Sequence, residues 1–146
     1  MLIKKTLRGH KNKVTCLAIM KNGNIVSGSM DKTLKIWDQS GRKLYDLSGH
    51  TEMISSVAIM KNENIISSSK DSTLKIWNEN GELLKTLSGH SKPIIYVAVM
   101  QKTGNIVSGS GDETLQIWDQ SGRKLYDQTL KIRDRNTLFL ERILDY

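Results

Sequence analysis

Cysteine, proline and aromatic residues are scarce in this sequence, and the shortage narrows the class of protein. The 146 residues include one cysteine, one proline and 5% aromatic residues. The lone cysteine, Cys16, cannot form an internal disulfide and is not by itself a metal site. It lies in an apolar run, TCLAI, where we expect a small buried side chain. With 38% hydrophobic and 25% charged residues, the composition is not that of a disordered, collagen-like or disulfide-rich chain, and we expect a soluble globular protein.

Long hydrophobic runs are also missing. No stretch approaches the roughly 18 apolar residues that a membrane-spanning helix needs. The opening MLIKKTLRGH lacks the apolar run of a secretory signal. A reducing compartment is then the default, and we expect a cytoplasmic protein without membrane contact.

The net charge of +7 and the pI near 9.5 raise the question of a polyanionic partner. The lysines are scattered through the sequence, however, and no block of five or six like charges occurs. This distribution favours solvated lysine-rich loops, and a nucleic-acid partner is kept as an alternative.

The sequence repeats with a period of about forty residues. The segment SGSMDKTLKIWD at 27–38 returns as SSSKDSTLKIWN at 67–78 and as SGSGDETLQIWD at 108–119. A Gly-His pair precedes each copy, at residues 9–10, 49–50 and 89–90. Because one such repeat cannot bury its own apolar faces, neighbouring repeats are expected to stack.

Each repeat contains four short runs rich in Val, Ile and Thr, separated by turn-forming Gly, Asn and Asp. In the first repeat we expect strands at 14–20, 24–29, 33–37 and 43–47. Strands joined by tight turns form an antiparallel meander, and strands that are apolar on both faces fit between two other sheets. The sequence therefore predicts an all-β fold.

The order changes after the third repeat. A fourth strand is expected at 123–126, but no further Gly-His pair follows. Instead DQTLKIRD at 127–134 resembles DKTLKIWD at 31–38, with Arg133 in place of the tryptophan. The final NTLFLERILDY fits either an outer strand or a short helix.

His, Ser, Asp and Trp recur in fixed order in every repeat. A Ser-His-Asp hydrolase would need one reactive serine in one cleft, whereas this set occurs three times, so no catalytic residue is assigned. A chain of hydrogen bonds from Trp to Ser to His to Asp would satisfy all four side chains inside a sheet. No metal-ligand spacing or cofactor motif is present. The residues are His10, Ser27, Asp31 and Trp37; His50, Ser67, Asp71 and Trp77; and His90, Ser108, Asp112 and Trp118.

The Gly-His pairs, the S-x-S-x-D-x-T-L-x-I-W run and the closing Trp-Asp resemble the WD-repeat β-propeller family. The resemblance implies three four-stranded blades at about 9–48, 49–88 and 89–127, an outer closing strand at 2–7, and a degenerate partial repeat or tail at 128–146. It gives the twelve residues above the role of structural hydrogen-bond tetrads. Asn78 departs from the closing Trp-Asp.

The resemblance also implies a binding surface on the narrow top face of the propeller. The positions it assigns are Lys13, Thr15, Met30, Met53, Ser55, Lys70, Pro93, Ile95 and Gly111. None is an arginine, which argues against the bidentate phosphate clamps of phosphopeptide readers. The expected function is a non-catalytic scaffold or adaptor for proteins or peptides. The alternatives are a targeting or regulatory portion of a ubiquitin-pathway or kinase-linked system and a nucleic-acid-associated propeller.

Three and a half repeats leave a propeller ring incomplete, because closed rings have about four to eight blades. The apolar faces of the end sheets then need a cover. We expect either a second copy that closes the ring as a homodimer or the remainder of a longer propeller, rather than a strained monomer.

Overall fold

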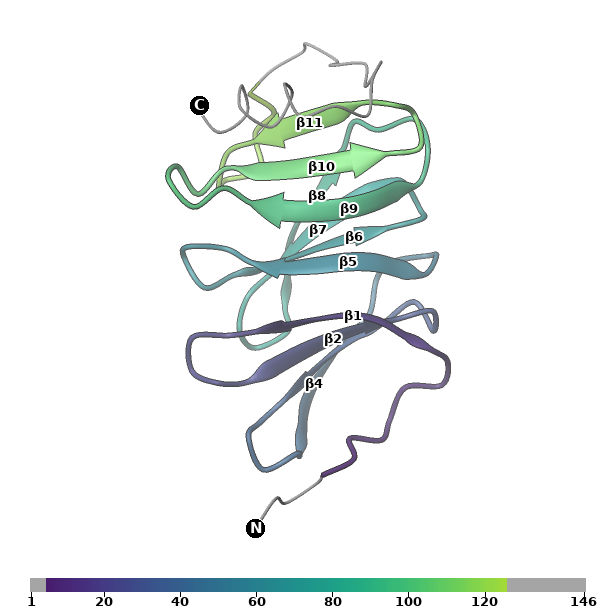
Figure 1. Cartoon of the computed structure of the whole chain (residues 1–146), viewed down its shortest axis with the longest axis vertical. Helices are drawn as coiled ribbons and strands as arrows, with labels where there is room; N and C mark the ends of the chain where they lie inside the picture. Colours follow the sequence, from purple (N-terminus) through teal and green to yellow (C-terminus); the bar gives the residue numbers. More distant parts are fainter. Residues whose placement is uncertain (1–4, 126–146) are drawn as a thin grey trace, which may run out of the picture.

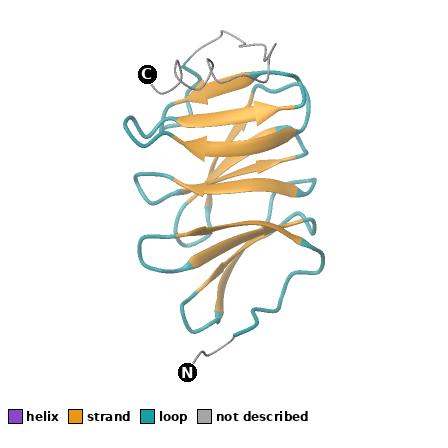
Figure 2. Cartoon of the chain, viewed as in Figure 1, coloured by secondary structure: helices purple, strands orange, loops and turns teal. Residues whose placement is uncertain are grey.

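The computed structural model describes residues 5–125, and these residues form strands joined by short turns (Figure 2). This part of the chain is all-β, as the sequence predicts, and contains no helix. Among the described residues, accordingly, no helix is long and apolar enough to cross a membrane.

The strands are grouped into three antiparallel sheets in which consecutive strands pair. The first sheet contains β1 (Val14–Ile19), β2 (Ile25–Ser29), β3 (Leu34–Trp37) and β4 (Lys43–Leu47). The second contains β5 (Ile54–Ile59), β6 (Ile65–Ser69), β7 (Thr73–Trp77) and β8 (Leu83–Ser88). The third contains β9 (Ile94–Val99), β10 (Ile106–Ser110) and β11 (Leu115–Trp118).

In the third sheet the structure describes three strands, and the end of the predicted fourth strand at 123–126 lies outside the described residues. The predicted fourth strand at 123–126 is represented by an isolated bridge between Trp118 and Lys124 and by a hydrogen bond of 2.9 Å from the Leu125 N–H to the Ile117 carbonyl. Its counterparts β4 and β8 continue to Leu47 and Ser88, and the matching end of the third repeat lies beyond residue 125. The predicted partial repeat at 128–146 is also outside the described residues.

The three sheets lie one above another, with β1, β5 and β9 forming successive layers (Figure 1). Apolar side chains fill the two spaces between the sheets as two separate core clusters. Of the predicted outer strand at 2–7, residues 5–7 lie in no strand. Lys5 instead donates a hydrogen bond from Nζ to the Ser40 carbonyl at 2.8 Å. The pairing of this segment with another sheet stays a prediction.

The first strand of each sheet has an irregular register near its start, which changes the sheet face on which the following side chains lie. The register of β1 shifts between Val14 and Cys16, and that of β5 shifts between Ile54 and Ser56. β9 has its shift at the same level, opposite Gly109 and Ser110. Such a bulge breaks the simple alternation of side chains at one point.

Candidate interaction surface

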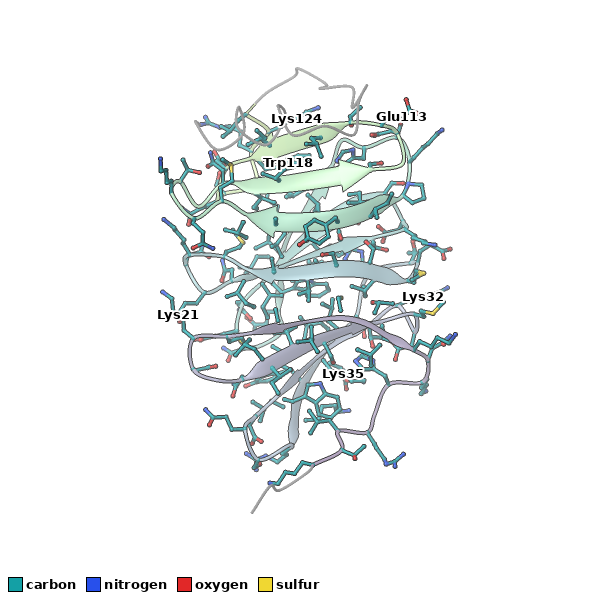
Figure 3. All side chains as sticks on the ribbon, in the orientation of Figure 1. Lys21, Lys32, Lys35, Glu113, Trp118 and Lys124 are labelled. Carbon is teal, nitrogen blue, oxygen red and sulfur yellow. The ribbon has the colours of Figure 1, made fainter. Side chains whose placement is uncertain are left out.

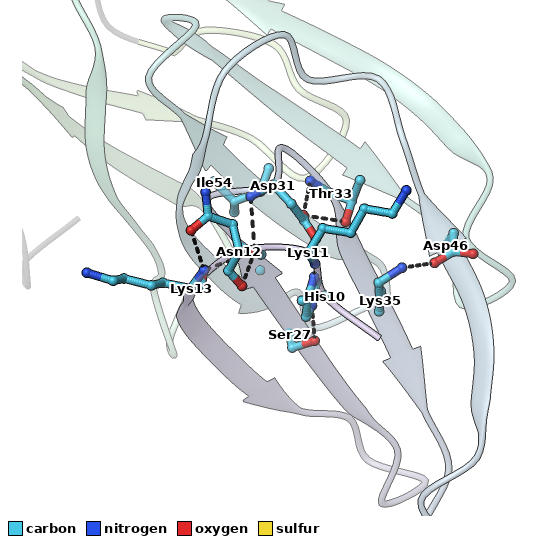
Figure 4. A network of polar contacts seen from close by, with 12 residues as sticks. His10, Lys11, Asn12, Lys13, Ser27, Asp31, Thr33, Lys35, Asp46 and Ile54 are labelled. Atoms are coloured by element: carbon cyan, nitrogen blue, oxygen red, sulfur yellow. Dashed lines mark hydrogen bonds and ion pairs between the residues drawn. The ribbon is translucent and has the colours of Figure 1, made fainter. Parts of the chain in front are cut away.

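The four recurring polar residues of the first repeat are joined in one chain of hydrogen bonds. Figure 4 shows three of them, His10, Ser27 and Asp31. The indole N–H of Trp37 donates to Ser27 Oγ at 2.9 Å, and Ser27 Oγ lies 2.7 Å from His10 Nε2. His10 Nδ1 lies 2.9 Å from Asp31 Oδ2. Because a carboxylate only accepts, Nδ1 carries the proton, and Nε2 then accepts from the serine hydroxyl.

The second and third repeats have the same arrangement. The Trp–Ser, Ser–His and His–Asp distances are 2.9, 2.8 and 2.8 Å in the second repeat. They are 3.1, 2.8 and 2.9 Å in the third. The three serines are buried, so their hydroxyls are enclosed by the sheet and bonded on two sides. This arrangement suits a framework rather than a nucleophile, which must be reached by a substrate.

The aspartate of each tetrad also holds the loops at the edge of its sheet. Asp31 Oδ1 accepts from the N–H and the hydroxyl of Thr33, at 3.0 and 2.6 Å, and Oδ2 accepts from the Lys11 N–H at 3.0 Å. The same contacts recur at Asp71 and Asp112. Each aspartate therefore connects the loop before the inner strand to the turn after the second strand.

These hydrogen bonds keep the aspartates ionised. Burial alone would raise the pKa of Asp112, but donation by Thr114, His90 and the Ser91 N–H lowers this pKa to about 2. The pKa values of Asp31 and Asp71 are lowered by the equivalent donors against the same opposing effect of burial. Desolvation lowers the pKa of His50, which favours its neutral form.

Asn78 shows why the closing aspartate can be replaced. In the first repeat, Asp38 Oδ1 accepts from the backbone N–H groups of Ser40 and Arg42. Asn78 Oδ1 accepts from those of Asn80 and Glu82, at 3.0 and 2.9 Å. The turn requires an oxygen acceptor at this point and not a charge.

The top face is the edge of the stack formed by the loops at 10–13, 50–53 and 90–93 together with the turns at 30–32, 70–72 and 111–113. Lys32 and Glu113 project from this edge, and Lys21 projects from the opposite one (Figure 3). Exposed lysines outnumber exposed glutamates here, five to two within the described residues. They are Lys11, Lys13, Lys32, Lys70 and Lys92, with Glu52 and Glu113.

Six of the nine residues assigned to this surface form three pairs, one at each sheet. A backbone hydrogen bond of 2.9 Å joins the Met30 N–H to the Lys13 carbonyl. The corresponding bonds run from Lys70 to Met53 and from Gly111 to Pro93, each at 3.1 Å. The pairs lie on neighbouring sheets and leave the Lys13, Lys70 and Pro93 side chains exposed.

Two of the other three assigned residues, Thr15 and Ser55, lie at the junctions between sheets. The Thr15 hydroxyl donates to the Ile54 carbonyl at 2.6 Å, and the Ser55 hydroxyl donates to the Ile94 carbonyl at 2.7 Å. Ile95 occupies the equivalent position in the third sheet, has no hydroxyl, and is 62% exposed. Cys16, expected to be a small buried residue, is half-buried against the first core cluster, and burial raises the pKa of its thiol.

Two further sets of residues support the top face and were not singled out by the sequence. The Ser29 hydroxyl lies within hydrogen-bond distance of the Asn12 and Lys13 carbonyls, at 3.2 and 2.9 Å. Ser69 donates to the Glu52 carbonyl, and Ser110 contacts those of Lys92 and Pro93. The threonines bind the tetrad aspartates, as described above. Their signal in the sequence is their repetition. The sets are Ser29, Ser69 and Ser110, and Thr33, Thr73 and Thr114.

The family model described as "WD domain, G-beta repeat" matches the chain three times, at residues 2–38, 41–78 and 81–119. The chain belongs to the WD40 repeat family. Each match starts before the Gly-His pair, whereas each sheet in the structure starts with the inner strand after it.

Similar proteins agree with this membership. Bovine WD repeat-containing protein 18 is 49% identical over 35 residues, which are 23% of this chain and 8% of that protein. The crystal structure of the computationally designed Ika4 protein is 35% identical, with a TM-score of 0.76 over 87% of this chain and 80% of that one. The RRP9 WD40 repeats are 25% identical, with a TM-score of 0.79 over 84% of this chain and 40% of that one. This chain thus spans less than half the length of WD repeat-containing protein 18 and of the RRP9 WD40 repeats.

Proposed function

We propose that the chain is a non-catalytic scaffold whose top face binds a segment of another protein. WD40 repeats generally mediate protein interactions. The observation that supports this function here is a contrast between two sets of residues. The tetrads are the same in all three repeats and are enclosed, whereas the residues beside them on the top face differ from repeat to repeat and include exposed side chains. A surface that varies on a constant framework suits recognition.

The chemistry of this surface indicates the chemistry of its partner. Lys13 and Lys70 are exposed on adjacent sheets, and Met30 lies beside Lys13. Lysines attract carboxylates, and methionine adapts to apolar side chains of varied shape. The partner segment is therefore acidic with interspersed apolar residues. Because none of the nine assigned positions is an arginine, bidentate capture of a phosphate group is disfavoured.

A random peptide library displayed against the immobilised chain tests this function. Selected peptides should be acidic and apolar, and the paired substitution Lys13→Glu and Lys70→Glu should weaken their binding by at least about tenfold. The matched control, Lys21→Glu with Lys61→Glu, makes the same charge change on the opposite edge and should leave the affinity unchanged. Equal binding to both variants, or the selection of no peptide, would contradict the proposal.

The alternative roles make different predictions for the two paired variants. A targeting or regulatory role within a ubiquitin-pathway or kinase-linked system would use the same surface, with the activity on another chain. Binding to nucleic acid that falls steeply with salt and ignores both paired variants would instead favour a nucleic-acid-associated propeller. A cytoplasmic location is part of this proposal.

A further inference from the structure

Each sheet has two faces, and the chain already contains two examples of how they join. The leading face of a sheet looks toward the N-terminal end of the stack, and the trailing face looks the other way. At the first junction, Met20, Val26 and Leu34 on a trailing face meet Ile54, Val57, Ile65 and Trp77 on a leading face. At the second junction, Met60, Ile66 and Leu74 meet Ile94, Val97, Ile106 and Trp118.

The two junctions use equivalent positions of successive repeats. Aligned on the repeats, Met20 corresponds to Met60 and Leu34 to Leu74 on the trailing faces. Val57 corresponds to Val97 on the leading faces. The same packing is therefore built twice from the same pattern of side chains.

The outer faces of the stack carry that pattern without a partner in the described residues. On the leading face of the first sheet, Val14 is 54% and Leu17 64% exposed. Their counterparts Ile54 and Val57 are 0% and 8% exposed. On the trailing face of the third sheet Tyr96 is 64% exposed, and Leu115 is half-buried whereas Leu34 and Leu74 are fully buried.

The positions of a third junction carry apolar residues, except that Gln128, outside the described residues, aligns with Leu47 and Leu87 of the two internal clusters. The trailing face of the third sheet supplies Met100, Val107 and Leu115. The leading face of the first sheet supplies Val14, Leu17, Ile25 and Trp37. We propose that the leading face of one chain packs on the trailing face of a second copy, so that two chains close a head-to-tail ring through two such junctions.

The geometry of the stack favours a second copy over contact within one chain. The two open faces lie at opposite ends (Figure 1), and in both internal junctions a leading face meets a trailing face and never its own kind. Contacts of this head-to-tail type either close into a ring or extend into a filament. Two copies of the three described sheets give six, within the roughly four to eight of closed propellers.

The internal junction also identifies two backbone positions that should meet between copies. A Cβ atom built on Gly28 would lie 3.1 Å from Ile54 Cβ across the first junction. Gly109 and Val14 are the equivalent positions at the open ends. A side chain is accepted at Gly109, since the second repeat has Ser68 there and a Cβ atom would meet only the tip of Leu115, at 3.1 Å.

The mass of the full chain in solution is the first test. Light scattering at micromolar concentration should give twice the 16.5 kDa of one chain. Leu17→Glu should give the monomer without loss of strand signal, because Leu17 faces solvent in the single chain. Leu17→Val, which introduces the residue of the other two repeats, should remain a dimer. A monomeric parent chain, whether its end faces are exposed or covered by residues 126–146, would overturn the proposal.

A disulfide tests the junction itself. In a Cys16→Ser background, Val14→Cys with Gly109→Cys should oxidise to a covalent dimer. The equivalent Cβ positions at the first junction are 3.1 Å apart, and a small relaxation brings such a pair to the roughly 3.5–4.5 Å that a disulfide spans. The control pairs Val14→Cys with Lys102→Cys, in the turn after β9, and should stay monomeric on a non-reducing gel. A ladder of higher multiples, or equal cross-linking of both pairs, would contradict a closed dimer. Neither readout involves a top-face ligand, so this inference and the proposed function can fail separately.

Discussion

Leu17 and Val57 occupy the same position in successive repeats, yet Leu17 is 64% exposed and Val57 is 8% exposed. The difference arises from their places in the stack, since the second sheet has a neighbour on both faces and the first has one neighbour within the described residues. In a repeat protein, each unit depends on its neighbours for burial. The buried positions of the middle sheet therefore identify the equivalent residues of the end sheets that a neighbouring sheet would bury.

The largest difference in stability is expected when the same charge is placed at Val57 and at Leu17. Val57→Glu buries an unpaired carboxylate, which costs about 3–5 kcal/mol and should leave little folded protein. Leu17→Glu should change the stability of the single chain by less than about 0.5 kcal/mol. Urea unfolding followed by tryptophan fluorescence, repeated at several protein concentrations to separate association from folding, measures both. Tolerance of Val57→Glu would mean that the first junction is not a packed core.

Tryptophan truncation compares the same two sheets through larger side chains. Trp77 belongs to the first core cluster, whereas Trp37 is buried within its own sheet and belongs to neither cluster. Trp77→Ala should cost about 3–5 kcal/mol. Trp37→Ala should cost about 1–2 kcal/mol less, when both are measured in the monomeric Leu17→Glu background. Both changes remove an indole N–H from a serine, so the difference isolates packing between sheets. Equal losses would contradict it.

The fold was predictable because the same pattern of strands and turns occurs three times in the sequence. The forty-residue period, the turn residues and the β-branched runs together predict the meanders. The hydrogen-bond order from Trp77 to Asp71 follows from the need to satisfy buried polar groups. The contribution of Ser29 to the loops was not predictable, because a serine in a strand gives no sign of which carbonyl it binds.

Exposure, by contrast, could not be predicted from sequence. Val14, Leu17 and their counterparts in the other repeats are equally apolar, so the pattern does not show which face lacks a neighbour. The fourth strand of the third sheet stays a prediction, because its end lies outside the described residues. Similarity between 123–126 and the first repeat predicts this strand, whose counterpart β4 pairs with β3 and forms the Lys35–Asp46 ion pair. The third repeat has Gln116 in place of Lys35.

The tetrads should show no contrast between the middle and end sheets, because each lies within one sheet. Ser67→Ala leaves the Trp77 indole and the His50 ring without their shared partner, and should cost about 1–3 kcal/mol. Ser27→Ala should cost a similar amount. Ser48→Ala, at an exposed position, is the control and should be nearly neutral. A much smaller loss in the first sheet than in the second, in the same urea measurement, would mean that tetrad stability also depends on a neighbouring sheet.

The smallest expected effect is a pH dependence that comes from His50. Desolvation lowers the pKa of His50 from 6.5, so the unfolded chain takes up a proton at this site near pH 6.5 while the folded chain does not. Stability from this residue is complete above pH 6.5 and decreases as the pH falls toward the folded-state pKa.

Urea midpoints between pH 7.5 and 5 should therefore decrease for the parent chain and decrease less for His50→Gln. The tetrad carboxylates act at lower pH, since the pKa of Asp71 is lowered from 3.8 and that of Asp112 to about 2, and they leave this window to the histidine. Because the slope with pH is compared, a uniform loss of stability in His50→Gln does not affect the result. An identical slope in the two proteins would show that the enclosure of His50 by the second sheet does not control its protonation.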